Sequence, residues 1–481
     1  MSNYSKQTNW GQFVPLVTVF FFWGFVAASN DILIPVFQKA FNLSQSQSQL
    51  VSVAFYIAYT VGSLIYMFIS KTIKQDLINK IGYKNGLITG LLISAAGTLL
   101  FYPAANMGSF PLMISGLFIV GLGFSLQQIV ANPLAIEIGP SETGSQRLTL
   151  AGGINNFGTT IGPLIVSFAI FGSASAANTE ASIESVKTPY LILGGLFVLV
   201  ALMLKFSSLP SVKPEEETKE EIVHTDGKTS AFQYPQLIMG MIAIFLYVGV
   251  EVSTASNLPA YMEKDLGFST KDVAPYISLY WAALMIGRWT GAVDAFDISG
   301  GFKKILRFLA PYLAFGVFLG VNAIAKHDLS HFYIFALIIL AMIAGDILSK
   351  GNPARMLLIF SLAGITCTAI GMLTTGMTSV YAFTSVGLFC STLWPCIFAL
   401  AINGLGKHTN QGSGFLIMMI MGGGIVSYLQ GVLADSIGIH LSYIVGIICF
   451  AYLAFYAIKV TSILRSQGIE LGDVKKSGGG H

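Results

Sequence analysis

Long apolar segments recur along almost the whole chain, and their spacing predicts its secondary structure. A helix needs about 20 mostly apolar residues to cross a bilayer, and fourteen segments of the 481-residue chain approach this length. They are expected near residues 13–38, 48–70, 84–104, 110–138, 147–171, 188–206, 236–262, 272–296, 305–325, 331–349, 354–375, 379–403, 411–434 and 438–464. The pattern therefore predicts an all-α membrane protein with fourteen spans.

One hydrophilic segment, residues 207–235, interrupts the apolar pattern. It contains the run KPEEETKEE, and a stretch of this composition cannot bury enough apolar surface to fold by itself. We expect it to be a cytoplasmic linker. It would join an N-terminal part with six spans, residues 1–206, to a C-terminal part with eight, residues 236–481.

The composition excludes an ordinary soluble protein. Hydrophobic residues make up 54% of the chain and charged residues 10%, whereas soluble domains average about 25% charged residues. A formal net charge of +3 gives no reason to expect nucleic acid as a partner. The four cysteines lie inside apolar segments without metal-ligand spacing, so we expect neither a metal site nor a cofactor. The expected surroundings are a lipid bilayer, and we expect a monomer.

Basic residues orient the predicted spans. An even number of spans places both termini on one side, and a single inner loop then receives four lysines: Lys71, Lys74, Lys80 and Lys84. The predicted outer loops PAANMGS and MTS contain no basic residue. The positive-inside rule therefore predicts that both termini lie in the cytoplasm, with the protein in the inner (plasma) membrane. Removing two adjacent spans would keep the parity, so the charges alone also allow twelve.

An internal repeat relates the two parts of the chain. Residues 41–44 (FNLS) resemble residues 266–269 (LGFS), at an offset of 225 positions, whereas residues 131–133 (ANP) resemble residues 393–395 (LWP) at an offset of 262. The two halves are therefore related in parallel, and extra chain near residues 305–349 adds a pair of helices to the second half. Parallel six-helix halves joined by a long loop are typical of the major facilitator architecture.

The apolar segment FFFWGFVAASNDILIP contains one acid, Asp31. A charged side chain within a bilayer costs on the order of 3 kcal/mol on insertion scales, so an acid kept there predicts a functional site. On a helix, Trp23, Asn30 and Asp31 share one stripe. An aromatic plate beside polar groups suits a sugar, which has an apolar ring face and hydroxyl groups. The alternative is that Asp31 merely pairs with a neighbouring helix.

Polar side chains also share one face of the fourth predicted span. Ser125, Gln128 and Asn132 have helical spacing, and such a stripe either bonds to neighbouring helices or binds a ligand. We favour ligand binding for Gln128 and Asn132. The other expected sugar contacts are Asn155, Asn257, Tyr280 and, as a second aromatic plate, Trp394.

Glu251 is the second acid within a predicted span and the rival of Asp31 as a coupling site. Its alternative role is to pair with Arg288 or with a backbone carbonyl. Arg288 lies in an IGR segment near the inner end of its span, where we expect a structural or gating role.

Other functional classes fit the sequence poorly. The motifs HExxH, GxSxG and Walker A are absent from the sequence, so we do not expect an enzyme. A channel would favour a repeated selectivity element, but the acids stand at non-equivalent positions of the two halves. We expect a secondary active transporter that works by alternating access. An uncoupled facilitator or channel stays the alternative.

Several motifs together carry a family resemblance: WGF…ND…P around Asp31, LQ…ANP around Gln128, FGTTIGP, YVGVEV, SLYW…MIGR and GLGKHTNQGSG. These segments resemble the fucose–galactose–glucose symporters of the major facilitator superfamily. The resemblance implies sugar–cation symport, with Asp31 at the position of the family's coupling acid.

Two positions refine what the resemblance implies. Gln128 stands where the fucose branch has a glutamate and the glucose/galactose branch a glutamine. Gly152 stands where the family usually has a glutamine that contacts sugar, whereas Asn155 matches the family. Glucose or galactose is therefore the expected substrate. Fucose and N-acetylglucosamine are the alternatives.

The expected driving ion is a proton or sodium. A carboxyl group in a water-poor cavity can take up a proton on one side and release it when the cavity rehydrates. Sodium would need several oxygen ligands near Asp31, which Asn30 and Gln128 could help to supply, with Glu251 as a further neighbour. One acid suffices for a proton, which favours it.

Overall fold

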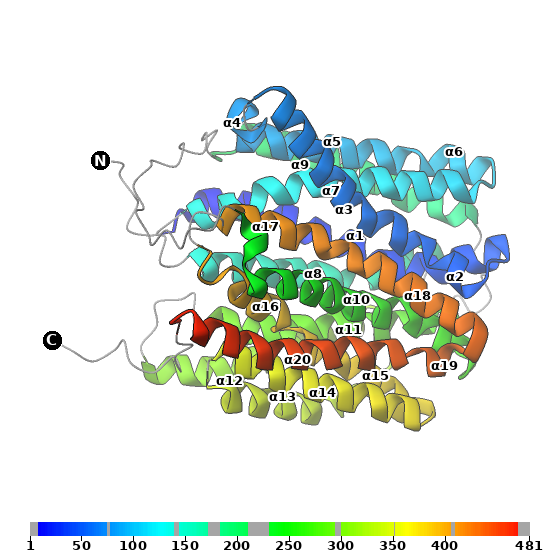
Figure 1. Cartoon of the computed structure of the whole chain (residues 1–481). Coiled ribbons are helices and arrows are strands. Elements are labelled where there is room, and N and C mark those ends of the chain that lie inside the picture. The colour runs from blue at the N-terminus through cyan, green and yellow to red at the C-terminus, as the bar shows by residue number, and fades with distance from the viewer. Residues whose placement is uncertain are drawn as a thin grey trace.

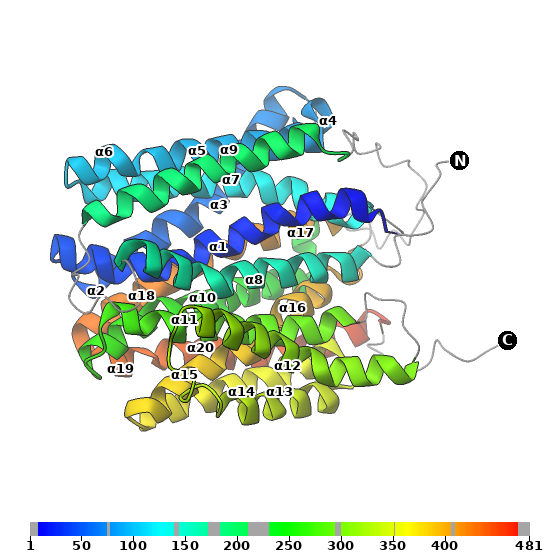
Figure 2. The same cartoon turned by 180° about the vertical axis from the view of Figure 1, so that it is seen from behind.

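The computed structural model describes residues 8–74, 77–138, 144–171, 183–209, 230–293, 300–350, 352–405 and 409–469. Helices dominate this part of the chain, and they run side by side as one elongated bundle (Figure 1). The start of α1 and the finish of α20 lie at the same end of the bundle in both views (Figures 1 and 2). We call this the terminal end, and we call the opposite end, where α1 finishes, the distal end. Most of the predicted linker, residues 210–229, lies outside the described residues.

The earlier helices precede residue 209. They are α1 (Trp10–Phe41), α2 (Gln45–Ser48), α3 (Leu50–Thr72), α4 (Leu77–Ile81), α5 (Tyr83–Leu99), α6 (Phe101–Asn106), α7 (Phe110–Glu137), α8 (Gly144–Phe171) and α9 (Lys187–Phe206).

The later helices follow residue 230. They are α10 (Pro235–Lys264), α11 (Thr270–Ala292), α12 (Gly300–Ile324), α13 (Phe335–Ser349), α14 (Pro353–Leu373), α15 (Gly376–Cys390), α16 (Leu393–Ile402), α17 (Thr409–Met418), α18 (Gly422–Ile437), α19 (Ile439–Ser442) and α20 (Ile444–Ser466).

Each of the fourteen predicted segments overlaps a long helix or two consecutive helices. Within the described residues, eleven helical segments are long and apolar enough to cross a membrane. The segments that fall short are α8, α11 and α13. Helix α13 has only 15 residues. Helices α8 and α11 carry glycines and polar residues, because each is surrounded by other helices: α8 packs on α1 and α11, and α11 packs on α8, α12 and α15.

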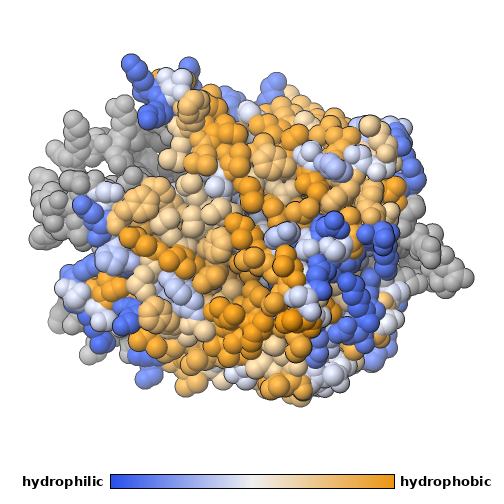
Figure 3. All heavy atoms as spheres, turned by 45° about the vertical axis from the view of Figure 1, so that its right-hand side comes forward, coloured by the Kyte–Doolittle hydropathy of each residue, from blue (hydrophilic) through white to orange (hydrophobic). Residues whose placement is uncertain are grey.

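The surface of the bundle matches a membrane protein. In the face shown in Figure 3, apolar side chains cover the middle, and hydrophilic residues gather mainly toward the two ends. Large exposed apolar residues, such as Phe68, Phe168, Leu199 and Ile458, occur on both earlier and later helices. Exposed apolar surface of this extent is expected where lipid replaces water.

Glycines let α1 and α8 touch backbone to backbone. A Cβ atom built on Gly24 would lie 2.0 Å from the carbonyl oxygen of Asn155, and one built on Gly158 would lie 2.2 Å from that of Phe21. Small residues at helix contacts are typical of membrane bundles, because dispersion forces act best at close approach.

Two seams join the earlier helices to the later ones. In one, α8 packs along α11, where the Ser278 hydroxyl donates to the Thr160 carbonyl at 2.6 Å. In the other, α3 packs along α18. A Cβ atom on Gly424 of α18 would lie 2.8 Å from the Cα atom of Val53. Helices α12 and α13 lie at one edge of the bundle (Figure 1), where α12 packs on α11 and α13 on α14.

The α1–α8 contact predicts a stability effect. Replacing Gly158 by alanine should push the two backbones apart and cost about 1–3 kcal/mol, as overpacking usually does. The thermal midpoint of the purified protein should fall. The matched control is Gly195→Ala on α9, where a Cβ atom would meet nothing within 4 Å. Equal midpoints for the two variants would contradict this role of Gly158.

Candidate functional site

The Asp31 carboxylate links α1 to two later helices. It is buried, with 2% of its surface exposed. The Ser256 hydroxyl of α10 donates to Oδ1 at 2.9 Å, and the indole nitrogen of Trp281 in α11 donates to Oδ2 at 2.9 Å. Both carboxylate oxygens therefore have a partner on a later helix, and the acid lies where α1, α10 and α11 meet.

The two partners of Asp31 differ in what they can do. An indole N–H can only donate, whereas a hydroxyl can donate or accept. A protonated Asp31 could therefore donate from Oδ1 to Ser256 while Oδ2 still accepts from Trp281. The Ser256 hydroxyl lies 3.5 Å from that of Ser52 on α3, which extends the polar chain toward the α3–α18 seam. The geometry thus accommodates both protonation states of the acid.

Glu251 forms a second polar cluster within the later helices. The Tyr247 hydroxyl, one turn earlier on α10, donates to its carboxylate. The Tyr280 hydroxyl donates to the Glu251 backbone carbonyl at 2.7 Å. Arg288 lies close enough to act on Glu251 electrostatically, and its Nε donates to the Ser391 carbonyl at 3.4 Å. The partners of Glu251 thus come from its own part of the chain.

Consecutive residues of α11 connect the two acids. Trp281 bonds to the Asp31 carboxylate and Tyr280 to the backbone of Glu251, and their rings meet edge to face at 5.5 Å. Tyr56 of α3 lies within electrostatic range of both acids. A movement of α11 would therefore change the surroundings of Asp31 and Glu251 together.

The predicted sugar contacts on the earlier helices lie in different settings. Gln128 is half-buried and hydrogen-bonds with the Tyr59 side chain, and Asn132 on the same face is also half-buried. The Asn155 amide donates to the Phe20 carbonyl at 2.9 Å. The Trp23 indole donates to Gln127 at 3.0 Å, so it packs between α1 and α7.

The remaining predicted contacts are divided between the middle and the distal end. Trp394 lies 6.3 Å, between ring centroids, from Tyr247, and is half-buried. Asn257 is buried near the distal end, where it accepts a hydrogen bond from the Gln45 amide at 3.1 Å. The side chain of Asn30 lies outside the described part of the structure.

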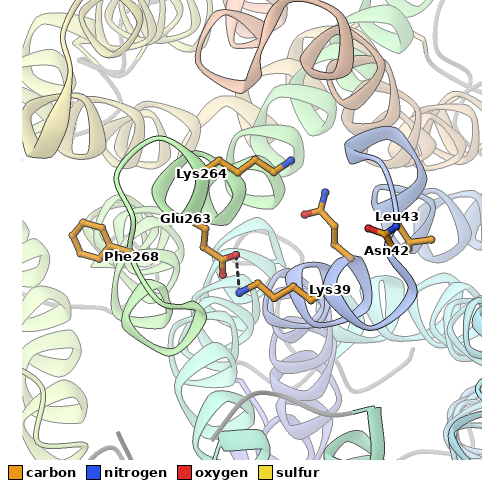
Figure 4. Close-up of a pocket in the computed structure, with 7 residues that line it drawn as sticks. Lys39, Asn42, Leu43, Glu263, Lys264 and Phe268 are labelled. Atoms are coloured by element: carbon orange, nitrogen blue, oxygen red, sulfur yellow. Dashed lines mark ion pairs between the residues drawn. The ribbon is translucent and has the colours of Figure 1, made fainter. Parts of the chain in front are cut away.

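Polar contacts between earlier and later helices close the distal end. Lys39 of α1 pairs with Glu263 of α10 at 3.1 Å (Figure 4). The carboxylate of Asp435 on α18 accepts the backbone N–H groups of Gln45 and Ser46, at 2.8 and 2.9 Å, and so caps the first turn of α2. Anionic groups are stabilised at such helix starts. These contacts join the ends of α1 and α2 to α10 and α18, above an acid that is itself buried.

Sequence reasoning did not identify Ser256 or Trp281 as partners of Asp31. The internal repeat aligns Phe55 and Tyr56 with Tyr280 and Trp281. It therefore draws attention to Trp281 but does not show that this residue donates to Asp31. Nothing in the sequence shows that Ser256, one of many hydroxyl residues in the spans, faces α1. Contacts of this kind depend on how α10 and α11 are placed against α1.

Comparison with known proteins gives a consistent result. The family model of the Major Facilitator Superfamily matches residues 16–325. A glucose/galactose transporter of Brucella abortus is 34% identical over 458 residues, covering 94% of this chain and 95% of that protein. The L-fucose-proton symporter of Escherichia coli is 27% identical over 470 residues, covering 92% of each chain. The chain therefore spans nearly the whole length of these relatives.

Solved structures agree with the sequence comparison. FucP, the fucose:proton symporter of Escherichia coli, in a structure of the outward conformation, has a TM-score of 0.60 and 26% identity. That alignment covers 93% of this chain and 98% of the other. This chain therefore resembles the fucose:proton symporter both in sequence and in fold.

The two donors to Asp31 lead to a stability prediction. Ser256→Ala and Trp281→Phe each leave one carboxylate oxygen unpaired, and each should cost about 1–3 kcal/mol. The thermal midpoint of the purified protein should report the loss. The double variant should lose less than the sum, because both donors serve one carboxylate.

A matched control exists one turn away on α10. The Ser253 hydroxyl is buried and has no hydrogen-bond partner within the described residues, so Ser253→Ala should leave the midpoint nearly unchanged. If Ser256→Ala and Ser253→Ala gave the same midpoint, the Asp31–Ser256 bond would contribute nothing to stability.

Proposed function

The chain belongs to the Major Facilitator Superfamily, and we propose that it is a hexose–proton symporter, with glucose or galactose as substrate. The observation that carries the proposal is Asp31, a buried acid on α1 whose two hydrogen-bond donors come from α10 and α11. Such an acid sits between parts that must separate during alternating access. Relatives described as a glucose/galactose transporter and as an L-fucose-proton symporter support the substrate class.

The proposed architecture has fourteen spans in two parallel six-helix halves, residues 1–206 and 236–481. Three pairs of packing contacts support this: α1 on α8 corresponds to α10 on α18, α3 on α7 to α11 on α15, and α5 on α9 to α14 on α20. The correspondence requires α12 and α13 to be an added pair. We place both termini in the cytoplasm at the inner membrane, so the distal end faces outward and sugar would enter there.

The proposed sugar site lies between Asp31 and Trp394. Gln128 and Asn132 are half-buried on one face of α7, and amides of this kind can both donate to and accept from hydroxyl groups. Trp394 and Tyr247 would supply apolar ring faces from the later helices. The greater identity to the glucose/galactose transporter than to the fucose symporter favours a gluco- or galacto-configured hexose.

In the proposed mechanism, the two states of the bundle give Asp31 different surroundings. With the distal end closed, Trp281 and Ser256 hold the carboxyl group away from outside water. Opening the distal end would separate α1 from α10 and α11, remove both donors and expose Asp31 to outside water, where it takes up a proton. Closing would return the protonated group to Ser256, whose hydroxyl can accept its hydrogen. The proton would leave toward the terminal end after the sugar.

A proton suits these surroundings better than sodium does. Sodium would need a shell of oxygen ligands around the carboxylate, as hard cations do. Both Asp31 oxygens instead meet an N–H or O–H donor.

Asp31→Asn tests the coupling. The amide resembles the protonated acid in shape and cannot lose a proton, so the variant should lose uphill hexose accumulation. Exchange of labelled for unlabelled hexose across the membrane should persist. Proteoliposomes given either an imposed pH gradient or an imposed sodium gradient would measure accumulation and identify the ion. Glu251→Gln is the matched control, and uphill transport that survived in Asp31→Asn would move the coupling site to Glu251.

Gln128→Ala tests the sugar site. Loss of a hydrogen bond to a buried ligand costs about 1–3 kcal/mol, so hexose should bind at least several-fold more weakly while the protein stays folded. Binding of labelled glucose and galactose to the purified protein would measure the change. Ser115→Ala, on the exposed side of the same helix, should bind as the wild type does. Unchanged affinity in Gln128→Ala would return this residue to a helix-packing role.

A further inference from the structure

The chain from α15 to α16 contains a break directly before Trp394. Ser391 and Thr392 separate the two helices. In an α-helix each carbonyl accepts from the N–H group four residues later, which for Ser391 belongs to residue 395. That residue is a proline and has no N–H group. The Ser391 carbonyl is therefore left without its helical partner.

Arg288 of α11 supplies the missing donor. Its Nε donates to the Ser391 carbonyl at 3.4 Å. The preceding residue lets α11 approach the break, because a Cβ atom on Gly287 would lie 1.9 Å from the Oγ atom of Ser391. The IGR segment thus combines a glycine that permits the close approach with an arginine that bonds across it.

The break has little support of its own. Thr392 stands at the N-cap of α16 without the side-chain bond that usually caps a helix, and its buried hydroxyl has no hydrogen-bond partner within the described residues. A cavity of about 180 Å³ adjoins the break and is lined by Arg288, Ser391 and Thr392 together with residues of α12, α13 and α14. The start of α16 therefore has space to shift if the bond from Arg288 is lost.

We infer that Arg288 is a positioning residue for the sugar site: it fixes the start of α16 and thereby the direction of the Trp394 ring. Trp394 is the second residue of α16, three positions after the carbonyl that Arg288 holds. A rotation of the helix start would carry the ring with it, because a side chain in the first turn follows the local backbone. That the ring meets a hexose rests on the proposed function, whereas its orientation by Arg288 does not.

A second connection leads from Arg288 to the same ring. Arg288 acts electrostatically on the Glu251 carboxylate, which accepts from the Tyr247 hydroxyl. The Tyr247 and Trp394 rings lie 6.3 Å apart. This connection depends on the charge of Arg288, whereas the bond to Ser391 depends on its Nε–H group. A variant that keeps a donor but loses the charge can therefore tell the two apart.

Two substitutions of Arg288 test the bond to Ser391. The amide nitrogen of glutamine is as many bonds from Cα as arginine Nε, so Arg288→Gln keeps a donor and removes the charge. Arg288→Met removes both. The purified Arg288→Met variant should bind labelled glucose and galactose several-fold more weakly than Arg288→Gln does. Lys304→Met, which removes an exposed cation on α12, should bind as the wild type does.

A double variant tests whether Arg288 acts through Trp394. Residues that serve one function give losses that do not add. Sugar binding by Arg288→Met with Trp394→Ala should therefore be no weaker than binding by Trp394→Ala alone.

A spectroscopic measurement tests the inference without a sugar. The chain has five tryptophans, and in protein labelled with fluorotryptophan the Trp394 signal is the fluorine NMR signal that Trp394→Phe removes. This signal should shift in Arg288→Met and stay near its wild-type position in Arg288→Gln. A general loss of stability would not shift the signal of the folded protein in one variant alone.

The outcomes separate the two proposals. If the wild type bound neither sugar while the Trp394 signal still shifted in Arg288→Met, the proposed substrate would be rejected and the positioning role retained. An unmoved Trp394 signal in Arg288→Met would overturn the positioning role. With a wild type that binds sugar, equal affinities of Arg288→Gln and Arg288→Met, or fully additive losses in the double variant, would overturn it as well.

Discussion

The buried carboxylate of Asp31 imposes the constraint on which the rest of the structure depends. An ionisable group in the interior of a membrane protein must meet polar partners, because neither lipid nor apolar side chains can replace water around it. On α1 the residues one helical turn away, Ala27 and Ala28 before it and Ile34 and Pro35 after it, offer no polar side chain, so the partners come from elsewhere. Ser256 and Trp281 supply them from α10 and α11, and the acid thereby fixes how α1 lies against the later helices.

The two acids differ in where their partners originate. Glu251 meets Tyr247 on its own helix and Tyr280 on a neighbouring later helix, so its hydrogen-bond partners move with it. Asp31 meets only partners across the boundary between earlier and later helices. A relative movement of these two groups of helices would keep the hydrogen bonds of Glu251 to Tyr247 and Tyr280 and would deprive Asp31 of both partners. The origin of the hydrogen-bond partners therefore favours Asp31 as the acid that responds to the movement. This origin cannot be inferred from the position of Asp31 in its apolar segment or from its residue type.

The sequence predicted the helices well and the contacts poorly, for physical reasons. Apolar length determines where a span lies, so every predicted segment overlaps a helix, including the two segments near residues 305–349, which overlap α12 and α13. Helices α8 and α11 are less apolar than most of the other spans, because each is surrounded by other helices: Gly158 of α8 faces α1, and Gly287 of α11 faces Ser391. Trp23 and Asp31 share a stripe in sequence, yet Trp23 bonds to Gln127 on α7 and Asp31 to later helices. Periodicity in the sequence shows which residues share a face of a helix. Which other helix each of these residues contacts depends on how the helices tilt and pack.

The glycines of α18 have a mechanical consequence. At Gly424 the backbone of α18 lies directly on that of α3, and at Gly431 a Cβ atom would lie 3.0 Å from the Cα atom of Ser46. Helices that interlock through large side chains must unpack them before they can tilt. Glycines at this contact leave few side chains that could interlock. Helices α3 and α18 can therefore change the angle between them with little repacking. The energy barrier to this tilting would then come mainly from the polar contacts at the distal end, such as Lys39–Glu263. Single substitutions of these residues could raise or lower it.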